Sequence, residues 1–390
     1  MPTYYAHQAT VSLGEEATAG TTATTSAHYP LHMESVTLPD EAADWKTIHA
    51  VGAGRDWNAV SEGKHTLEKG TLEGKLIKGD ILFYAFGQVT ETGTAKAGGG
   101  SSTLTSGLAA GVTVIPVASA ASLAAGDMIN IGANDTYPEV REIASIDGLN
   151  VTVTKAIRLA KTTGKTVVEV EAPYTHTLSV GNEFKSFTVE ASIDSATDYV
   201  RKFNGCYVNG MKIDCEEGGE LNASFPLIGM NTSAAGTTAT TVSIPTTAPY
   251  LFNQGAITCM GGAIATVNSF GVDMKNNMKG KHYIQSTNGL NVYEVGTGKR
   301  NIEITMSAVP QSNAWTERMR PGAQSAATTF SAVFTRATST DVLTLSATGV
   351  YLKDLGQPVP EEGEFVTDMT LIAKTLSATV IDSTPYYLMV

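Results

Sequence analysis

Two runs of adjacent carboxylates are the residues that most resemble a catalytic pair. They are Glu216-Glu217 and Glu361-Glu362. Paired carboxylates can hydrolyse a glycosidic bond when one acts as the acid and the other as the nucleophile or base. Each run is followed by glycine, as is typical of tight turns, so we interpret both as hairpin tips. The sequence has no GxSxG, HExxH, P-loop or dinucleotide-binding motif. We therefore expect no enzymatic activity.

The residues that could bind a metal are few and dispersed. Cys206, Cys215 and Cys259 form no CxxC pair, and so sparse and odd a set makes no disulfide framework. The histidines are His7, His28, His32, His49, His65, His176 and His282. None of them stands in a cluster with cysteine. We expect reduced thiols, no metal site and no cofactor.

Acidic side chains recur on one side of segments that alternate between apolar and polar residues. Ile302, Ile304 and Met306, for example, alternate with polar neighbours that include Glu303. This period of two is typical of a half-buried antiparallel strand. The acidic residues that we expect on outward polar faces are Glu190, Glu220, Asp273, Glu303, Glu364 and Asp368.

The composition limits the elements that can position these residues. The chain of 390 residues exceeds one typical domain, and its 42% hydrophobic content allows a sizeable core. Only 16% of the residues are charged, and Gly, Thr, Val and Ile recur in short runs, which favours strands and turns. The net charge of -12 argues against tight nucleic-acid binding, because neutralising phosphates requires Lys and Arg. We find no signal peptide and no apolar segment long enough to span a membrane.

An internal repeat is the most informative feature of the sequence. Aligning Gly205 with Gly349 without gaps gives these identical pairs: Gly205/Gly349, Tyr207/Tyr351, Glu217/Glu361, Gly219/Gly363, Glu220/Glu364, Leu227/Leu371 and Ile228/Ile372. Earlier in each copy, the run that begins Gly63-Lys64 matches the run that begins Gly298-Lys299. The same order of elements therefore occurs twice, which predicts two related domains.

The repeat and two low-complexity stretches predict the domain boundaries. We expect an N-terminal arm at 1–26, a first domain at 27–97 and 173–230, an inserted β domain at 98–172, a linker at 231–255 and a second domain at 256–390. The arm would order only against a neighbour or fray. Five short strand signals between 112 and 170 indicate a small inserted β-barrel. One helix is expected in each repeat, from Asp80 to Phe86 and from Asn313 to Arg320.

Three segments resemble the tail tube proteins of long-tailed phages and related viruses. The first is Phe187-Thr188-Val189-Glu190, and the second is 199–210, followed by 219–221. The third is 268–277, followed by 298–302. The resemblance covers most of the chain outside 1–26 and 98–172. It implies a mainly β fold with two tandem β-sandwich or barrel domains, each with a short helix, beside the small inserted barrel.

The same resemblance implies a structural virion protein that is made in the host cytoplasm and built into the tail. Its partners would be further copies of itself and other tail proteins. Members with one domain are expected to form hexameric rings, so a duplicated chain would form trimeric rings with pseudo-sixfold symmetry. If each repeat gives four strands to the wall, the ring closes at roughly 50 Å between backbones, given ~4.8 Å spacing and ~45° tilt. Side chains would leave about 40 Å, which admits a DNA duplex.

In such a ring the acidic faces would line the lumen. A basic wall would hold the DNA phosphates, whereas an acidic wall repels them over a range of ~8 Å at physiological salt. Glu220 and Glu364 are the strongest candidates because the repeat pairs them. The alternative interpretation is a sheet face that is merely solvated.

Two other classes of protein remain open on the sequence. Trp45, Trp57 and Trp315 could stack on sugars in a carbohydrate-binding or adhesive β-sandwich. They are few and widely separated, which favours core or interface roles. Another virion part, such as a capsid decoration or tail-terminator protein, is the remaining alternative.

Overall fold

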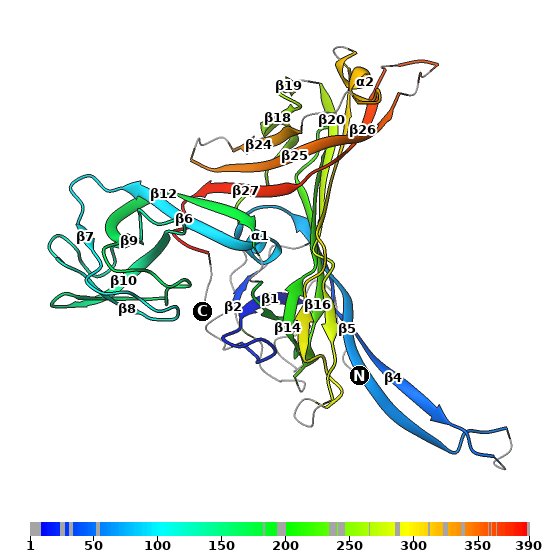
Figure 1. The fold of residues 1–390 in the computed structure, drawn as a ribbon, viewed down its shortest axis with the longest axis horizontal. Helices are drawn as coiled ribbons and strands as arrows, with labels where there is room; N and C mark the ends of the chain where they lie inside the picture. The colour runs from blue at the N-terminus through cyan, green and yellow to red at the C-terminus, as the bar shows by residue number, and fades with distance from the viewer. Residues whose placement is uncertain are drawn as a thin grey trace.

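Figure 1 shows the chain in a computed structural model. The structure describes residues 9–23, 28–30, 34–51, 55–181, 184–192, 200–233, 240, 246–264, 266–284, 289–310, 313–322, 327–336, 340–357, 359, 361–363 and 365–387. Antiparallel strands dominate these residues, and the helices are short. The prediction of a mainly β fold is confirmed.

One continuous antiparallel ladder, here called the long ladder, runs through both halves of the chain. Its order is β3 (Ser35–Thr37) and β4 (Asp40–Ile48) along β5 (Ala59–Lys75), then β16 (Asn222–Gly229), β15 (Gly210–Glu216), β20 (Val267–Lys275), β23 (Asn301–Ala308), β26 (Thr367–Ile372) and the C-terminal part of β25 (Val342–Gly356). One of its faces is apolar and buried, and includes Ile213, Val272 and Ile304. The opposite face carries mostly polar side chains.

A second layer covers the apolar face of the long ladder. In the first half its order is β2 (His28–Pro30), β1 (Thr10–Glu15), β13 (Phe187–Ser192), β14 (Val200–Val208) and β17 (Asn231–Thr232). In the second half it is β19 (Gly262–Ile264), β18 (Gly255–Cys259), β24 (Thr328–Thr335), the N-terminal part of β25 and β27 (Thr375–Asp382). A 3-10 helix (Phe252–Gln254) precedes β18, and a hairpin of β21 (Lys279–Lys281) and β22 (Glu294–Gly296) follows β20. The two halves therefore share one strand order.

The strand registers of the two halves agree at residues that the sequence repeat equates. Tyr207 lies opposite Ile228 where β14 meets β16, and Tyr351 lies opposite Ile372 where β25 meets β26. The sequence alignment equates these same residues. The repeat in the sequence therefore corresponds to a repeat in strand pairing, and two tandem domains with the predicted boundaries remain our proposal for the organisation.

The N-terminal segment departs from the prediction. β1 pairs with β13 along its length, from Thr10 opposite Ser192 to Glu15 opposite Phe187, and Leu13 is buried. An arm that orders only against a neighbour, or frays, is therefore wrong for 10–15. Val11 and Leu13 are the strand's only two apolar residues, so its alternation was too short to detect.

The ribbon that carries the insertion begins directly after the helix of the first half. α1 (Asp80–Phe86) runs directly into β6 (Gly87–Ala95), which pairs with β12 (Thr166–Val180) as a long ribbon. β12 also pairs with β27, so the ribbon extends the second layer of the second half. At its far end lie β7 (Ser101–Thr103), β8 (Val114–Pro116), β9 (Met128–Ile131), β10 (Glu139–Asp147) and β11 (Asn150–Val153), around a separate apolar core. Figure 1 shows this small domain at the far left.

A buried ionic cluster fixes the small domain to the ribbon. The guanidinium of Arg141 pairs with Glu91 of β6 at 2.8 Å and with Glu139 at 2.7 Å, and all three side chains are fully buried. Lys161 also pairs with Glu139, at 3.1 Å. The backbone N–H of Tyr387 donates to Glu91, which ties the C-terminal segment to the same point. Removing one member of such a cluster would leave an unpaired buried charge, which is strongly destabilising.

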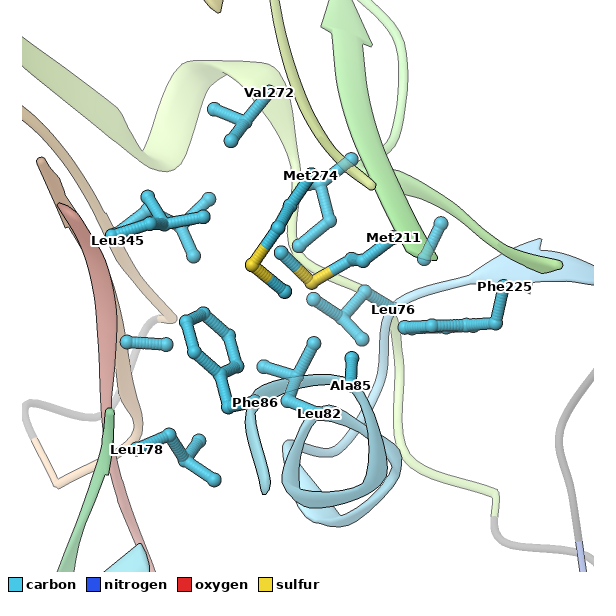
Figure 2. Close-up of a cluster of buried hydrophobic side chains, with 14 of the residues drawn as sticks. Leu76, Leu82, Ala85, Phe86, Leu178, Met211, Phe225, Val272, Met274 and Leu345 are labelled. Carbon is cyan, nitrogen blue, oxygen red and sulfur yellow. The ribbon is translucent and has the colours of Figure 1, made fainter. Parts of the chain in front are cut away.

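Helix α1 contributes apolar side chains to the core that the two halves share. Figure 2 shows its residues Leu82, Ala85 and Phe86 directed toward Met274 and Leu345 of the second half. The helix ends at Gly87, whose φ of 82° is the left-handed conformation that favours glycine at this position. Its counterpart α2 (Ala314–Arg318) is shorter than expected and has no buried residue.

Candidate functional site

The polar face of the long ladder is the candidate functional site, because it is one surface built from both halves. Strand register sets Ser224, Lys212, Asp273 and Glu303 side by side across β16, β15, β20 and β23. Their neighbours along each strand alternate into the buried core. The face therefore continues without interruption from the first half into the second.

Four of the predicted acidic residues lie on or beside this face. Asp273 and Glu303 lie on adjacent strands, and Asp368 lies on β26 opposite Ser307, whose hydroxyl donates to it at 2.8 Å. Glu220 stands at the start of the β16 segment, where its carboxylate lies 3.4 Å from the ammonium of Lys75. All four are partly or fully exposed in the chain.

The same face also carries lysines, which the predicted acidic pattern did not include. Lys275 pairs with Asp273 at 3.2 Å, and Lys353 pairs with Glu303 at 2.8 Å. Lys212 pairs with Asp214 at 3.2 Å. The signal was present, because a lysine and an aspartate two residues apart on a strand share a face. Partly exposed pairs of this kind contribute only ~0–1 kcal/mol each, so they set the charge pattern more than stability.

Glu190 contradicts the expectation of an exposed acidic residue. It lies on β13 in the second layer, is only 2% exposed, and pairs with Lys202 at 3.0 Å. The N–H and hydroxyl of Thr240 also donate to it, at 2.6 and 3.0 Å. Burial raises the pKa of Glu190, but the Thr240 hydrogen bonds and the Lys202 ammonium outweigh burial and hold it below its usual value. β13 is covered on both faces, which alternation alone does not reveal.

The other predictions concern Glu364, the carboxylate turns and the cysteines. Glu364 lies outside the described residues. Glu217 stands in the turn between β15 and β16, in agreement with its interpretation as a hairpin tip. Burial raises the pKa of the Cys215 and Cys259 thiols to about 11. The third thiol, Cys206, is also free and buried.

Metal-binding clusters and membrane-spanning helices are both absent from the parts of the chain that the structure covers. No group of three or more His, Cys, Asp or Glu side chains in those parts is arranged to hold a metal ion. Across the same ranges, no helix combines the length and the apolar character needed to cross a membrane.

Comparison with known proteins agrees with the resemblance. The family described as phage tail tube protein matches residues 6–379, which span both halves and the insertion. A comparison with curated proteins gives no match. The family match favours a structural component of the virion tail over the carbohydrate-binding and decoration alternatives. The chain belongs to the phage tail tube protein family.

Proposed function

We propose that three copies of this chain close into a ring, that the rings stack into a hollow tube, and that viral DNA passes through it. The supporting observation is the pairing of β15 with β20, which joins the two equivalent halves edge to edge. β15 is the last long-ladder strand of the first half, and β20 is the first of the second half. One chain thus already contains one of the junctions that a ring needs.

The strands at the free edges of the long ladder are equivalent to the two strands that pair within the chain. They can therefore form the other junctions of the ring. β3 and β4 stand where β20 stands in the second half, and the end of β25 stands where β15 stands in the first. Within the chain, Gly210 lies opposite Lys275. The equivalent residues at the free edges are Asp354 and Ala42. Repeating the internal register between chains sets these two residues opposite each other and continues the ladder around the ring.

The polar face of the long ladder is the proposed lumen wall. Its apolar face is covered by the second layer, and the inserted domain lies beyond that layer (Figure 1). Placing the polar face inward therefore places the insertion on the outer surface, clear of the DNA. Glu220, Asp273, Glu303 and Asp368 would face the phosphates, with interspersed lysines. Such a mixed but acidic wall binds DNA weakly, since tight binding depends on neutralising phosphates with cations.

The β4–β5 hairpin is the proposed contact between stacked rings. It projects far from the body of the chain (Figure 1). Trp45 and Trp57 are 58% and 55% exposed near its end, and Ile48 and Val60 are also exposed. Large apolar side chains gathered on a projecting element are typical of an interaction surface. Burial against the next ring would remove them from water.

Native mass spectrometry and negative-stain microscopy of the purified protein test the proposal. Rings of three chains that stack into tubes with an open lumen are expected. Rings of six chains would reject the proposed equivalence of the halves. A protein that stays monomeric under all assembly conditions would reject the ring itself.

A further inference from the structure

A largely exposed tryptophan stands at the tip of the β4–β5 hairpin. Ile48 and Ala59 form the last pair of this ladder, and the N–H of Asn58 donates to the Ile48 carbonyl at 2.8 Å. The N–H of Ala50 donates to the side chain of Asn58 at 3.0 Å, which ties the two sides of the tip together. Trp57 comes directly before Asn58 and is largely exposed. The hairpin therefore presents an indole at its far end.

The surroundings of this indole are apolar as well. Ile48 and Val51 are exposed at the same tip. A tryptophan removes ~150–250 Å² from water when another surface covers it, and tryptophan is enriched among the residues that dominate binding between proteins. The tip thus has the character of an inserting element that lacks its receiving surface within the chain.

An apolar groove of about 370 Å³ lies in the second half. β18, β19, the start of β20, the end of β24 and the 3-10 helix surround it. Phe270 and Phe334, whose rings stack at 5.5 Å, lie along it together with Ile257, Ile264 and Val267. No described residue that lines the groove carries a charge.

The chemistry of the groove selects an uncharged, apolar occupant. A charged side chain that entered it would lose its hydration without gaining a partner. Asn253 is the one polar side chain among the described lining residues, and it is exposed at the rim. An indole matches this arrangement, because it offers a large apolar ring and a single N–H that an amide oxygen can accept.

The tip and the groove lie at opposite ends of the molecule. Figure 1 shows β18 and β19 at the top and the β4–β5 hairpin at the bottom. A contact between unlike surfaces of identical chains leaves one tip and one groove free at the ends, so it can repeat without limit. A contact between like surfaces would instead close after two copies. A second copy of this chain is therefore the occupant that suits a stacked tube.

We infer that the hairpin tip of one chain enters the groove of a chain in the next ring, with the Trp57 indole against its apolar lining. The inference rests on the proposed function, in which this hairpin joins stacked rings, and it names the receiving surface. Each ring then carries tips on one face and grooves on the other. The direction of stacking is fixed by this difference between the two faces.

Two single substitutions test the two sides of this contact. Trp57→Ala removes the indole, and Val267→Asp places a carboxylate in the groove. Each should leave rings intact in native mass spectrometry and lower the fraction of rings in tubes at least about tenfold. Sedimentation velocity and negative-stain microscopy measure that fraction. If Val267→Asp does not fold, Ala263→Glu at the exposed rim of the groove replaces it.

Mixing the two variants as separately prepared rings tests their pairing. Rings of the Trp57→Ala chain keep the groove, and rings of the Val267→Asp chain keep the tip. One face of each ring remains competent, so the mixture should give stacks of two rings and no tubes. Tubes in the mixture, or rings that never pair, would show that tip and groove are not partners.

Leu149→Ala is the control, since Leu149 is an exposed apolar residue on the inserted domain. It should form tubes like the unmodified chain. Normal tubes from Trp57→Ala would overturn the inference, and so would a loss of the rings themselves, which would put the tip in the contact within a ring. An unmodified chain that forms no rings would instead reject the proposed function.

Discussion

Gly205 and Gly349 adopt the same left-handed backbone conformation, with φ of 62° and 66°, at the same point of the two halves. Each lies where a strand passes from the second layer into the long ladder, and each coincides with a shift in strand register. A Cβ at Gly205 would stand 2.6 Å from Met230, and one at Gly349 would stand 2.6 Å from the Cβ of Lys374. The two glycines are therefore required by geometry in both halves.

Alanine at either glycine is expected to destabilise the chain by about 2 kcal/mol or more, because the positive φ and the close contact both oppose a Cβ. Thermal or urea unfolding of Gly205→Ala and Gly349→Ala measures the loss. Gly98→Ala is the matched control, since Gly98 has φ of 73° and no atom within 4 Å of an added Cβ. Equal losses in all three variants would show that the contacts at Gly205 and Gly349 carry no cost.

The stability of the chain should fall as pH rises, because of Glu15. Burial raises the pKa of this carboxyl from 4.5 to about 8, and its Oε2 has no hydrogen-bond partner among the described residues. The folded chain thus holds a proton that the unfolded chain releases at lower pH. The contribution is complete below about pH 4.5 and is lost as pH rises through about 8.

Glu15→Gln should therefore remove this loss and stabilise the chain by about 2 kcal/mol or more at about pH 9. The measurement is the melting temperature between about pH 5 and about pH 9. Glu171→Gln, at an exposed position on β12, serves as the control and should leave the profile unchanged. A Glu15→Gln profile as steep as that of the unmodified chain would contradict the assignment.

The small inserted domain should be dispensable for tube formation. Ala95 and Val170 lie opposite each other where the ribbon enters the domain. An Asn-Gly turn can replace 96–169, since this dipeptide favours a two-residue hairpin. The change Glu91→Gln should accompany it, because the deletion removes Arg141, the buried partner of Glu91.

Negative-stain microscopy of this deletion variant should show tubes that lack only their outer projections. Restoring Glu91 in the deletion should lower the melting temperature, because this carboxylate would keep the Tyr387 N–H but lose its counter-charge Arg141. A deletion variant that unfolds cooperatively but forms no rings would place the domain in the ring contact.

Period-two alternation identified the buried and exposed sides of β23 and β16, because a strand has one side chain per face in turn. The same pattern misplaced Glu190, since alternation does not show that Thr240 and Lys202 contact the second face of β13. The repeat was detectable because residues such as Tyr207 and Tyr351 keep the same register. The pairing of the β6–β12 ribbon with β27 was not detectable, because it joins residues far apart in the sequence.

The lumen assignment predicts a salt-dependent effect on DNA. Glu220→Lys with Asp368→Lys adds cations to the polar face and should change stability by less than about 0.5 kcal/mol per residue. DNA should then be retained in assembled tubes at low salt and released at high salt, because phosphate contacts are salt-dependent. The control places the same charges on the insertion, as Asp147→Lys with Glu171→Lys. Retention by both variants alike would show that the polar face does not line the lumen.

Disulfide cross-linking at the free edges tests ring closure most directly. Asp354→Cys with Ala42→Cys places two thiols opposite each other if chains repeat the Gly210–Lys275 register. The native cysteines are buried and should not react. Asp354→Cys with Ala43→Cys is the control, because the side chain of Ala43 points to the other face. Oxidised tubes run on a non-reducing gel should give cross-linked bands up to three chains and none larger. Bands of up to six chains, or no cross-linked band from intact tubes, would contradict the trimeric ring.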